Sequence, residues 1–459
     1  MSDQADVVVL GLGPGGEDAA GQLAEAGLDV VAVDGDLVGG ECPYWGCVPS
    51  KMMIRAANLL AEGRRVPGLA GSATIEPDWS VVARRIRDDA TDDWDDRAAV
   101  ERLEGRGARF VRGWGRLDGP GRVAVGDRVF EASRAIVLDT GAKPWAPPIT
   151  GLAGTPYWTN RDAIEVEDLP GSLIVLGGNA IGVELAQVFS RFGVDVTVVE
   201  VGPRLVGAEE PESSALLAQV FADEGITVRT GASVDAVDHD QRFTLRLADG
   251  ADVVGDRLLV ATGRRPDLAA IGVGTIGLDE QADAIAVDDY LRAAPGVWAI
   301  GDMTGHGAFT HVSMYQSRIA VADILGRPGA AASYDAVPRV TFTDPEIGSV
   351  GLTEAQARAA GLAVRVGTAD IAASPRGWIH QAGNAGLIKL VEDADRGVLV
   401  GATSAGPVGG EVLGLLVLAV HAAVPTSSLA EMIYAYPTFH RAIETAVDDL
   451  GDRPNDGKT

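Results

Sequence analysis

One strand–turn–helix–strand pattern occurs twice in this chain and limits the folds that are open to it. Near the start, an apolar run over residues 7–10 is followed by Gly11, Gly13 and Gly16 in the spacing G-x-G-x-x-G, and a second apolar run over residues 30–33 ends at Asp34. Such a strand–turn–helix–strand unit binds a dinucleotide, because glycines let the backbone approach a pyrophosphate at a helix N-terminus and the acid accepts from ribose hydroxyls.

The pattern returns further along in "SLIVLGGNAIGVELAQVFSRFGVDVTVVE". Here Gly177, Gly182 and Glu200 stand at one constant offset from Gly11, Gly16 and Asp34. Asn179 replaces the middle glycine, and we expect it to be tolerated because Asn accepts unusual backbone angles better than most residues. The two units predict two bound dinucleotides.

Three more apolar runs end in a turn with glycine. They end at Thr140-Gly141, Thr262-Gly263 and Gly301-Asp302. Each would return the chain to a sheet near a bound nucleotide, and Asp302 could meet a ribityl chain or a ribose hydroxyl.

Length and charge limit the class of protein. A chain of 459 residues exceeds one hydrophobic core, so several domains are expected. A net charge of −27 argues against nucleic-acid binding, which needs basic patches. No apolar run approaches the roughly 20 residues that cross a bilayer, and no basic segment precedes the first apolar run, so we expect no membrane span, no signal peptide and a cytoplasmic location.

The last third alternates strands and helices without a nucleotide fingerprint. "GEVLGLLVLAVHAAVP" predicts a helix that is apolar on nearly every face and is therefore buried, either within its own chain or against another subunit. A turn at Pro437 leads into a final helix, and the tail over residues 451–459 is expected to be disordered.

The stretch "GGECPYWGCVPSK", residues 39–51, holds the only two cysteines, Cys42 and Cys47. A disulfide framework needs more cysteines, and a zinc site needs about four ligands, whereas the histidines are scattered, so no metal site is expected. A redox pair and two inert buried thiols both remain possible from the residues alone.

These motifs, in this order, resemble the pyridine nucleotide–disulfide oxidoreductases, the flavoprotein family of glutathione reductase, lipoamide dehydrogenase and mercuric reductase. The resemblance is carried by both fingerprints, the cysteine block, "ATGRRP", "GDMTG", "TFTDPEIGSVGLTE" and "YPTFHRAIE". It implies an α/β fold with two Rossmann-like domains and an α+β dimerisation domain. The implied division is residues 1–153 and 271–335 for FAD, 154–270 for NAD(P), and 336–459 for the dimer.

The resemblance also assigns ligands and partners. It implies FAD on the first unit, NAD(P)H on the second, and an obligate homodimer whose active site is shared and acts on a small molecule. FAD would be held by Gly11, Gly13, Gly16, Asp34, Gly115, Thr140, Gly141, Asp302 and Thr310. The other expected cofactor contacts are Gly15, Gly40, Glu41, Lys51, Gly177, Asn179, Gly182, Glu200, Gly263 and Gly301.

The implied reaction carries electrons from NAD(P)H through FAD to a Cys42–Cys47 disulfide, and on to a small disulfide or other electrophile. Cys47 would lie against the flavin, Cys42 would face the substrate, and Lys51 would pair with Glu184. The alternative is a diaphorase, quinone reductase or transhydrogenase that does not use the cysteines. NADH is preferred in this prediction because Glu200 would repel a 2′-phosphate, although Arg204 could pair with that phosphate.

One block departs from the family. Where typical disulfide reductases carry "HPTxxE", this chain has Tyr436 at the His position and Arg441 at the Glu position. Tyr436, together with Trp45 in the cysteine block, resembles soluble transhydrogenase. We expect His440 and Glu444, four residues apart on one helix, to form a substitute acid–base pair, with Tyr436 donating a hydrogen bond to the substrate. Tyr436 acting alone, and no general acid at all, are the other possibilities.

Overall fold

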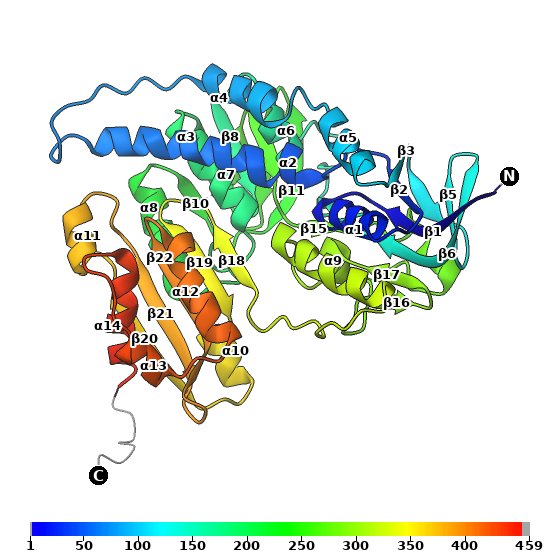
Figure 1. Ribbon diagram of the computed structural model, residues 1–459. Coiled ribbons are helices and arrows are strands. Elements are labelled where there is room, and N and C mark those ends of the chain that lie inside the picture. Colours follow the sequence, from blue (N-terminus) through cyan, green and yellow to red (C-terminus); the bar gives the residue numbers. More distant parts are fainter. Residues whose placement is uncertain (1, 452–459) are drawn as a thin grey trace, which may run out of the picture.

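The computed structural model describes residues 2–451, which form five sheets, and the three largest of these each organise one part of the molecule (Figure 1). The first sheet has a parallel centre, in which β1 lies between β2 and β6. Its strands, in spatial order, are β16 (Arg292–Ala294), β17 (Val297–Ala299), β6 (Arg128–Leu138), β1 (Ser2–Leu10), β2 (Val30–Asp34) and β3 (Arg109–Arg112). Two further strands, β4 (Gly115–Leu117) and β5 (Arg122–Val125), extend it through β6.

The apolar runs read from the sequence become the centre of this sheet. Val7, Val9 and Val31 have no exposed surface, as expected for parallel strands covered on both faces. The first strand is longer than expected, since residues before Val7 also pair with β6. Helices α1 (Pro14–Glu25) and α9 (Thr310–Ile324) pack together over one face.

The second sheet is fully parallel and belongs to the second nucleotide unit. Its order is β10 (Thr227–Arg229), β9 (Asp195–Val199), β8 (Ser172–Leu176) and β14 (Arg257–Val260). Helices α6 (Asn160–Glu165), α7 (Ala180–Arg191) and α8 (Pro211–Asp223) accompany it, with an antiparallel sheet of β11 (Val234–Asp240), β12 (Arg242–Leu247) and β13 (Asp252–Gly255).

The cysteine block forms two helices that join the first two units. α2 (Glu41–Tyr44) is short, and α3 (Cys47–Arg65) runs along α7 of the second unit (Figure 1). The chain then passes through α4 (Trp79–Arg85) and α5 (Arg97–Gly105) before β3. Residues 42 and 47 therefore lie where the two nucleotide units meet.

The third sheet is antiparallel, in the order β18 (Pro338–Thr341), β19 (Glu346–Gly351), β22 (Val398–Gly406), β21 (Leu387–Asp393) and β20 (Val364–Asp370). Its helices are α10 (Glu354–Ala359), α11 (Pro375–His380), α12 (Gly409–His421), α13 (Thr426–Glu431) and α14 (Ala442–Asp449). Within one chain the apolar helix α12 is buried on one side only, and its expected cover by another subunit stays a prediction. Leu416 is fully buried against the sheet, whereas Leu418 is 57% exposed.

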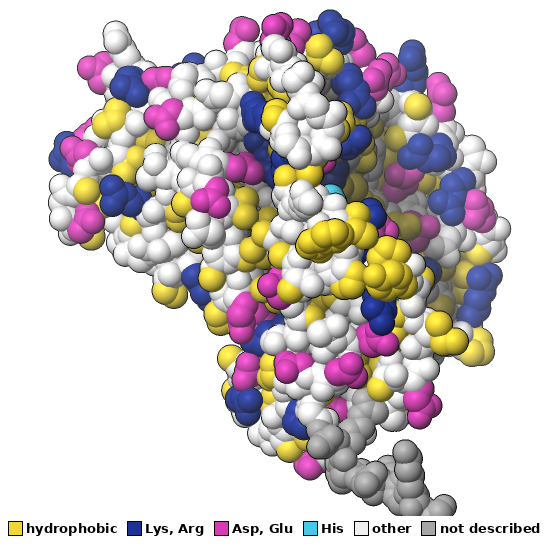
Figure 2. Space-filling model, turned by 90° about the vertical axis from the view of Figure 1, so that its left-hand side faces the viewer, with side chains coloured by type: hydrophobic (Ala, Val, Ile, Leu, Met, Phe, Trp, Pro, Cys, Tyr) yellow, Lys and Arg dark blue, Asp and Glu magenta, His cyan; other side chains and the backbone are white. Residues whose placement is uncertain are grey.

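Hydrophobic side chains also gather on the face that carries α11 (Figure 2). Large exposed side chains of this domain include Trp378, Ile379, Ile433 and Tyr436, and Ile433 is 97% exposed. Among the described residues, no helix combines the length and the apolar content needed to cross a membrane. The disorder expected for the tail falls, beyond residue 451, outside the described residues.

Candidate active site

The first glycine turn brings α1 into contact with the strand ends. Gly11 follows β1 with a φ of +90°, and a Cβ there would lie 2.4 Å from the carbonyl oxygen of Asp139. A Cβ on Gly16 would lie 2.2 Å from the oxygen of Gly11. No side chain fits at either position, so the N-terminus of α1 points at the space where a pyrophosphate would bind.

Acidic groups line the same space. Asp34, at the end of β2, accepts hydrogen bonds from the amides of Leu12 (2.6 Å) and Asp36 (2.8 Å), and burial raises its pKa. Burial also raises the pKa of Asp302, at the start of the 3₁₀ turn η3 (Gly301–Thr304). A Cβ on Gly141, which follows β6, would have open space around it. These carboxylates can accept hydrogen bonds from the hydroxyl groups of FAD, and the open space beside Gly141 leaves room for the cofactor.

The other expected FAD contacts surround this turn. A Cβ on Gly40 would lie 3.0 Å from the Cα of Gly13, and one on Gly15 would lie 2.1 Å from the hydroxyl of Ser313. Gly115 starts β4 and lies against Leu10 of β1. The structure therefore brings these positions together, while their contact with FAD stays a prediction.

The second unit repeats the geometry. A Cβ on Gly177 would lie 2.4 Å from the oxygen of Ala261, and one on Gly182 would lie 2.0 Å from the oxygen of Gly177. The open position after the strand is Gly263. The reason expected for tolerating Asn179 is wrong, because its φ of −92° and ψ of −179° are ordinary extended angles.

The two cysteines differ in their environment. Cys47 is the first residue of α3, and its Sγ lies 3.4 Å from the Oγ1 of Thr310, the first residue of α9. The hydrogen bond from Cys42, with further help from Thr310 and the Lys51 ammonium, lowers the pKa of Cys47 to about 6. The same hydrogen bond and burial raise the pKa of Cys42. The pair is thus polarised, with the thiolate on Cys47 and the proton on Cys42.

Lys51 and Glu184 join three parts of the molecule next to this pair. The Nζ of Lys51 lies 2.7 Å from Glu184 Oε2, so the expected ion pair is present. The other oxygen of Glu184 accepts from the amide of Phe342 (2.8 Å), which directly follows β18 of the third sheet, and Lys51 lies over the Phe342 ring. The ammonium is therefore held in place by groups from the second nucleotide unit and from the third sheet.

Comparison with known proteins decides the family. Residues 5–317 match the family described as pyridine nucleotide-disulphide oxidoreductase, and residues 337–447 match the dimerisation domain of the same family. The chain belongs to this family. The resemblance, the fold class and the FAD and NAD(P)H cofactors expected from the sequence are confirmed, and the protein is an FAD-dependent oxidoreductase.

Relatives of this oxidoreductase have several activities. It is 34% identical over 464 residues to a dihydrolipoyl dehydrogenase of Thermus scotoductus, with 97% of each chain covered. It is also 34% identical over 458 residues to a mercuric reductase of Streptomyces lividans, with 96% of this chain and 95% of that one covered. A solved structure, the Cu(II) complex of the HOCl-induced flavoprotein disulfide reductase RclA from Escherichia coli, superimposes with a TM-score of 0.86 at 26% identity, covering 97% of this chain and 99% of that chain.

The acid–base pair expected in the oxidoreductase does not form in the described chain. His440 lies in the 3₁₀ turn η4 (Phe439–Arg441), before α14 begins, and its ring centroid is 6.1 Å from that of Tyr434. Glu444 instead pairs with Arg441 at 2.9 Å, three residues away, because the guanidinium reaches it across one turn. Arg441 also stands 5.3 Å from the ring of Tyr436, which is 68% exposed.

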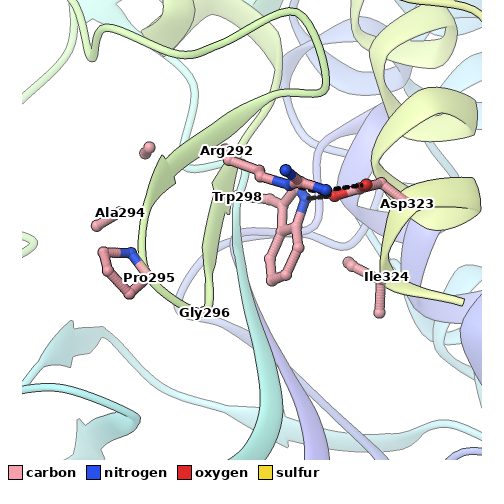
Figure 3. A pocket seen from close by; sticks show the side chains of 8 residues that line it. Arg292, Ala294, Pro295, Gly296, Trp298, Asp323 and Ile324 are labelled. Atoms are coloured by element: carbon pink, nitrogen blue, oxygen red, sulfur yellow. Dashed lines mark hydrogen bonds and ion pairs between the residues drawn. The ribbon is translucent and has the colours of Figure 1, made fainter. Parts of the chain in front are cut away.

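Two surface cavities differ in their relation to the cysteines. One of about 530 Å³ lies between α1 and α9 and is lined by Asp18, Gln22, Thr310, His311, Met314 and Arg318. It includes the threonine that contacts Cys47. The other, of about 470 Å³, lies at the far end of α9, about 20 Å away at 1.5 Å per residue (Figure 3). There Arg292 and Trp298 both bind Asp323, so its charged groups satisfy each other.

Two positions of the oxidoreductase were not found from the sequence. Asp139, 5% exposed at the end of β6, accepts from the amide of Gly16 at 2.6 Å, and burial raises its pKa well above the usual range. Arg161, on α6, binds Glu41 beside Cys42. An acid closing the apolar run "AIVLD" was a signal for the first, whereas nothing in the sequence indicated the second.

Proposed function

We propose that this oxidoreductase takes electrons from NADH, passes them to the Cys42–Cys47 pair and delivers them to a small disulfide or other electrophile. The observation that carries the proposal is the polarised pair of thiols. Cys47 begins α3, Lys51 follows one turn later, and the pKa of Cys47 is lowered to about 6, while Cys42 keeps its proton. Reactive cysteines lie in electropositive, partly exposed settings of this kind.

The residues divide the work. Bound FAD would supply the two-electron chemistry between the nicotinamide and the thiols. When the disulfide opens, two electrons enter the pair, Cys47 keeps the negative charge, and Cys42 takes up a proton. Lys51, fixed by Glu184, stabilises the charge on Cys47. Cys42 is then the sulfur that exchanges with the substrate.

A second copy of the chain would complete this site. The matched dimerisation domain and the exposed apolar face with Trp378, Ile433 and Tyr436 support a homodimer with a shared active site. We place the enzyme in the cytoplasm, where a dithiol can cycle in a reducing environment.

Tyr436 is the proposed proton donor to the substrate. Arg441 stands over its ring and is held there by an ion pair with Glu444. His440 is the competing donor, since histidine transfers protons best near neutral pH.

NADH is the proposed electron donor. Glu200 directly follows β9 of the second unit, where its charge would repel a 2′-phosphate. Arg204 donates to Ser214 (2.7 Å) and to the carbonyl oxygen of Gly207 (2.7 Å), so its guanidinium is already bound to other groups.

The altered acid–base block supports a second candidate, an electron-transfer enzyme of the diaphorase, quinone reductase or transhydrogenase type. In that case the cysteines would not be needed for turnover, because such acceptors require no protonation of a leaving thiolate.

One stopped-flow experiment tests the first proposal against the second. Flavin reduction by NADH and reoxidation by disulfide and quinone acceptors are followed in wild type, Cys42→Ser, Tyr436→Phe and His440→Ala. The thiol proposal expects Cys42→Ser to keep flavin reduction and to lose reoxidation by disulfides. If Tyr436 is the proton donor, Tyr436→Phe should slow that reoxidation by about 10²-fold or more, whereas His440→Ala should reoxidise at nearly the wild-type rate.

Two outcomes contradict this assignment. Turnover of every acceptor at the wild-type rate in Cys42→Ser would favour the electron-transfer enzyme. A slow His440→Ala variant beside a normal Tyr436→Phe variant would move the proton donor to His440.

A further inference from the structure

The carboxylate that directly precedes Cys42 is bound by three side chains of the second nucleotide unit. Glu41 accepts from Arg161 through Nε (2.8 Å) and Nη2 (2.6 Å), and from the Asn160 amide (2.9 Å). The guanidinium of Arg264 lies 3.5 Å from its other oxygen. Glu41 is thus anchored to α6 by a planar guanidinium and an amide at once.

Trp45, which lies between the two cysteines, is held by the same helix. The guanidinium of Arg161 stacks on its ring at 3.8 Å, and its indole N–H donates to Glu165 at 2.5 Å. The Asn160 amide donates to its carbonyl oxygen at 2.9 Å. α6 therefore grips the cysteine block on both sides of Cys42.

The segment between the gripped residues is short and closed. The amide of Trp45 donates to the carbonyl oxygen of Glu41 at 2.8 Å, and a Cβ on Gly46 would lie 2.9 Å from that same oxygen. Cys47 follows directly as the first residue of α3. Fixing Glu41 and Trp45 thus restricts the positions that Cys42 can take relative to Cys47.

We propose that Arg161 is a positioning residue for the redox pair: together with Glu41 it is part of a clamp that restricts the movement of Cys42 relative to Cys47 and so favours the disulfide over the dithiol. The clamp is defined as Arg161, Glu41, Asn160 and Trp45. The inference rests on the proposed use of the two cysteines, and it adds the control of their redox equilibrium by the nucleotide unit.

The physical reason is entropy. Bond formation between two thiols needs a narrow range of Cα separations and angles. A clamped segment has already lost part of its backbone freedom, whereas a free one must lose it when the bond forms. Freeing about one residue shifts the equilibrium by roughly tenfold toward the dithiol. The looser segment would also weaken the hydrogen bond from Cys42 that holds the Cys47 thiolate.

The experiment measures the redox equilibrium without relying on turnover. The FAD-loaded protein is equilibrated with mixtures of reduced and oxidised dithiothreitol, in which one protein disulfide and one dithiothreitol dithiol form for each pair of protein thiols oxidised. The remaining thiols are alkylated and counted by mass. The variants are Arg161→Ala, Arg161→Lys and Glu41→Gln, and the control is Arg102→Ala, which removes an exposed ion pair with Glu17.

If the clamp acts as proposed, the dithiol–disulfide equilibrium of all three variants should shift about tenfold toward the dithiol, while that of Arg102→Ala should equal the wild-type value. Lysine should fail because an ammonium supplies neither the fork nor the stacking plane. The pH midpoint of Cys47 alkylation should rise in the same three variants, although none of them alters Lys51 or Thr310.

An effect of charge through space predicts a different pattern, which would overturn the proposal. It expects opposite shifts in Arg161→Ala and Glu41→Gln, and a wild-type value in Arg161→Lys. Wild-type values in all three variants would overturn it too. If wild type itself forms no disulfide in this titration, the proposed function fails, which is a separate and recognisable result.

Discussion

The two nucleotide units of this oxidoreductase have nearly the same geometry, but one glycine of the first unit is not required in the second. Cβ atoms on Gly11 and Gly177 would each lie 2.4 Å from the carbonyl oxygen at the end of a neighbouring strand. Asp34 and Glu200 each accept, at 2.6 Å, from an amide of the glycine turn. These positions are fixed by the turn itself, and they therefore recur.

The middle position of the motif differs between the units. A Cβ on Gly13 would lie 3.0 Å from the carboxylate of Asp139, whereas Ala261 occupies the corresponding strand end in the second unit. Both Gly13 and Asn179 have extended angles that any residue adopts. A glycine is therefore needed at the middle position only in the unit where the buried carboxylate of Asp139 lies behind the turn.

The largest loss of activity is expected from a substitution that distorts the second nucleotide unit and leaves the first intact. Gly182→Ala should lower the rate of flavin reduction by NADH about 100-fold or more, because its Cβ would meet the oxygen of Gly177 at 2.0 Å and displace α7. FAD content, read from flavin absorbance, should stay complete. Gly16→Ala should instead yield protein that has lost FAD. Loss of FAD in Gly182→Ala would show that the units are not independent.

A smaller effect separates the acids that end the two units. Glu200→Gln should narrow the NADH preference over NADPH by about tenfold, because it removes the charge that repels a 2′-phosphate. Steady-state kcat/KM values for both nucleotides measure this. Asp34→Asn is the matched control and should leave the ratio alone, since it lies in the first unit. An unchanged ratio in Glu200→Gln would remove the basis for NADH preference.

The middle position can be tested directly. Gly13→Asn should lower FAD affinity by about 1–3 kcal/mol through crowding with Asp139, and Asp139→Ala in the same chain should restore part of that loss. FAD titration of the apoprotein by fluorescence gives the double-mutant cycle. Additive losses would mean that Asp139 is not the reason for the glycine.

The smallest effect concerns the ionisation of Asp139. Burial raises the pKa of this carboxyl above its unfolded value, so the stability it contributes at low pH is lost as pH rises from about 4 toward that raised pKa. Asp139→Asn has no proton to lose and still accepts from the amide of Gly16. Its Tm should therefore gain about 2–4 °C on wild type over that pH range, measured by thermal denaturation. A constant difference at every pH would contradict the assignment.

The parallel centre of the first sheet, the parallel second sheet, both glycine turns and the acids that follow them could be predicted from the sequence alone. These are local consequences of strand, turn and helix patterns, and they need no knowledge of distant residues. The same holds for the cysteine block, because Cys42, Cys47 and Lys51 lie within one short stretch that becomes α2 and α3.

Only the tertiary structure decided which groups complete the site. Arg161 reaches Glu41 from α6 of the second nucleotide unit, and Asp139 contacts the first turn of α1 although over a hundred residues separate them. The failure of the expected His440–Glu444 pair has a similar origin. Spacing alone allowed the pair, but the 3₁₀ turn before α14 and the reach of Arg441 gave Glu444 another partner. Sequence spacing limits which side chains can meet, and competition among neighbours in space selects the pairs that form.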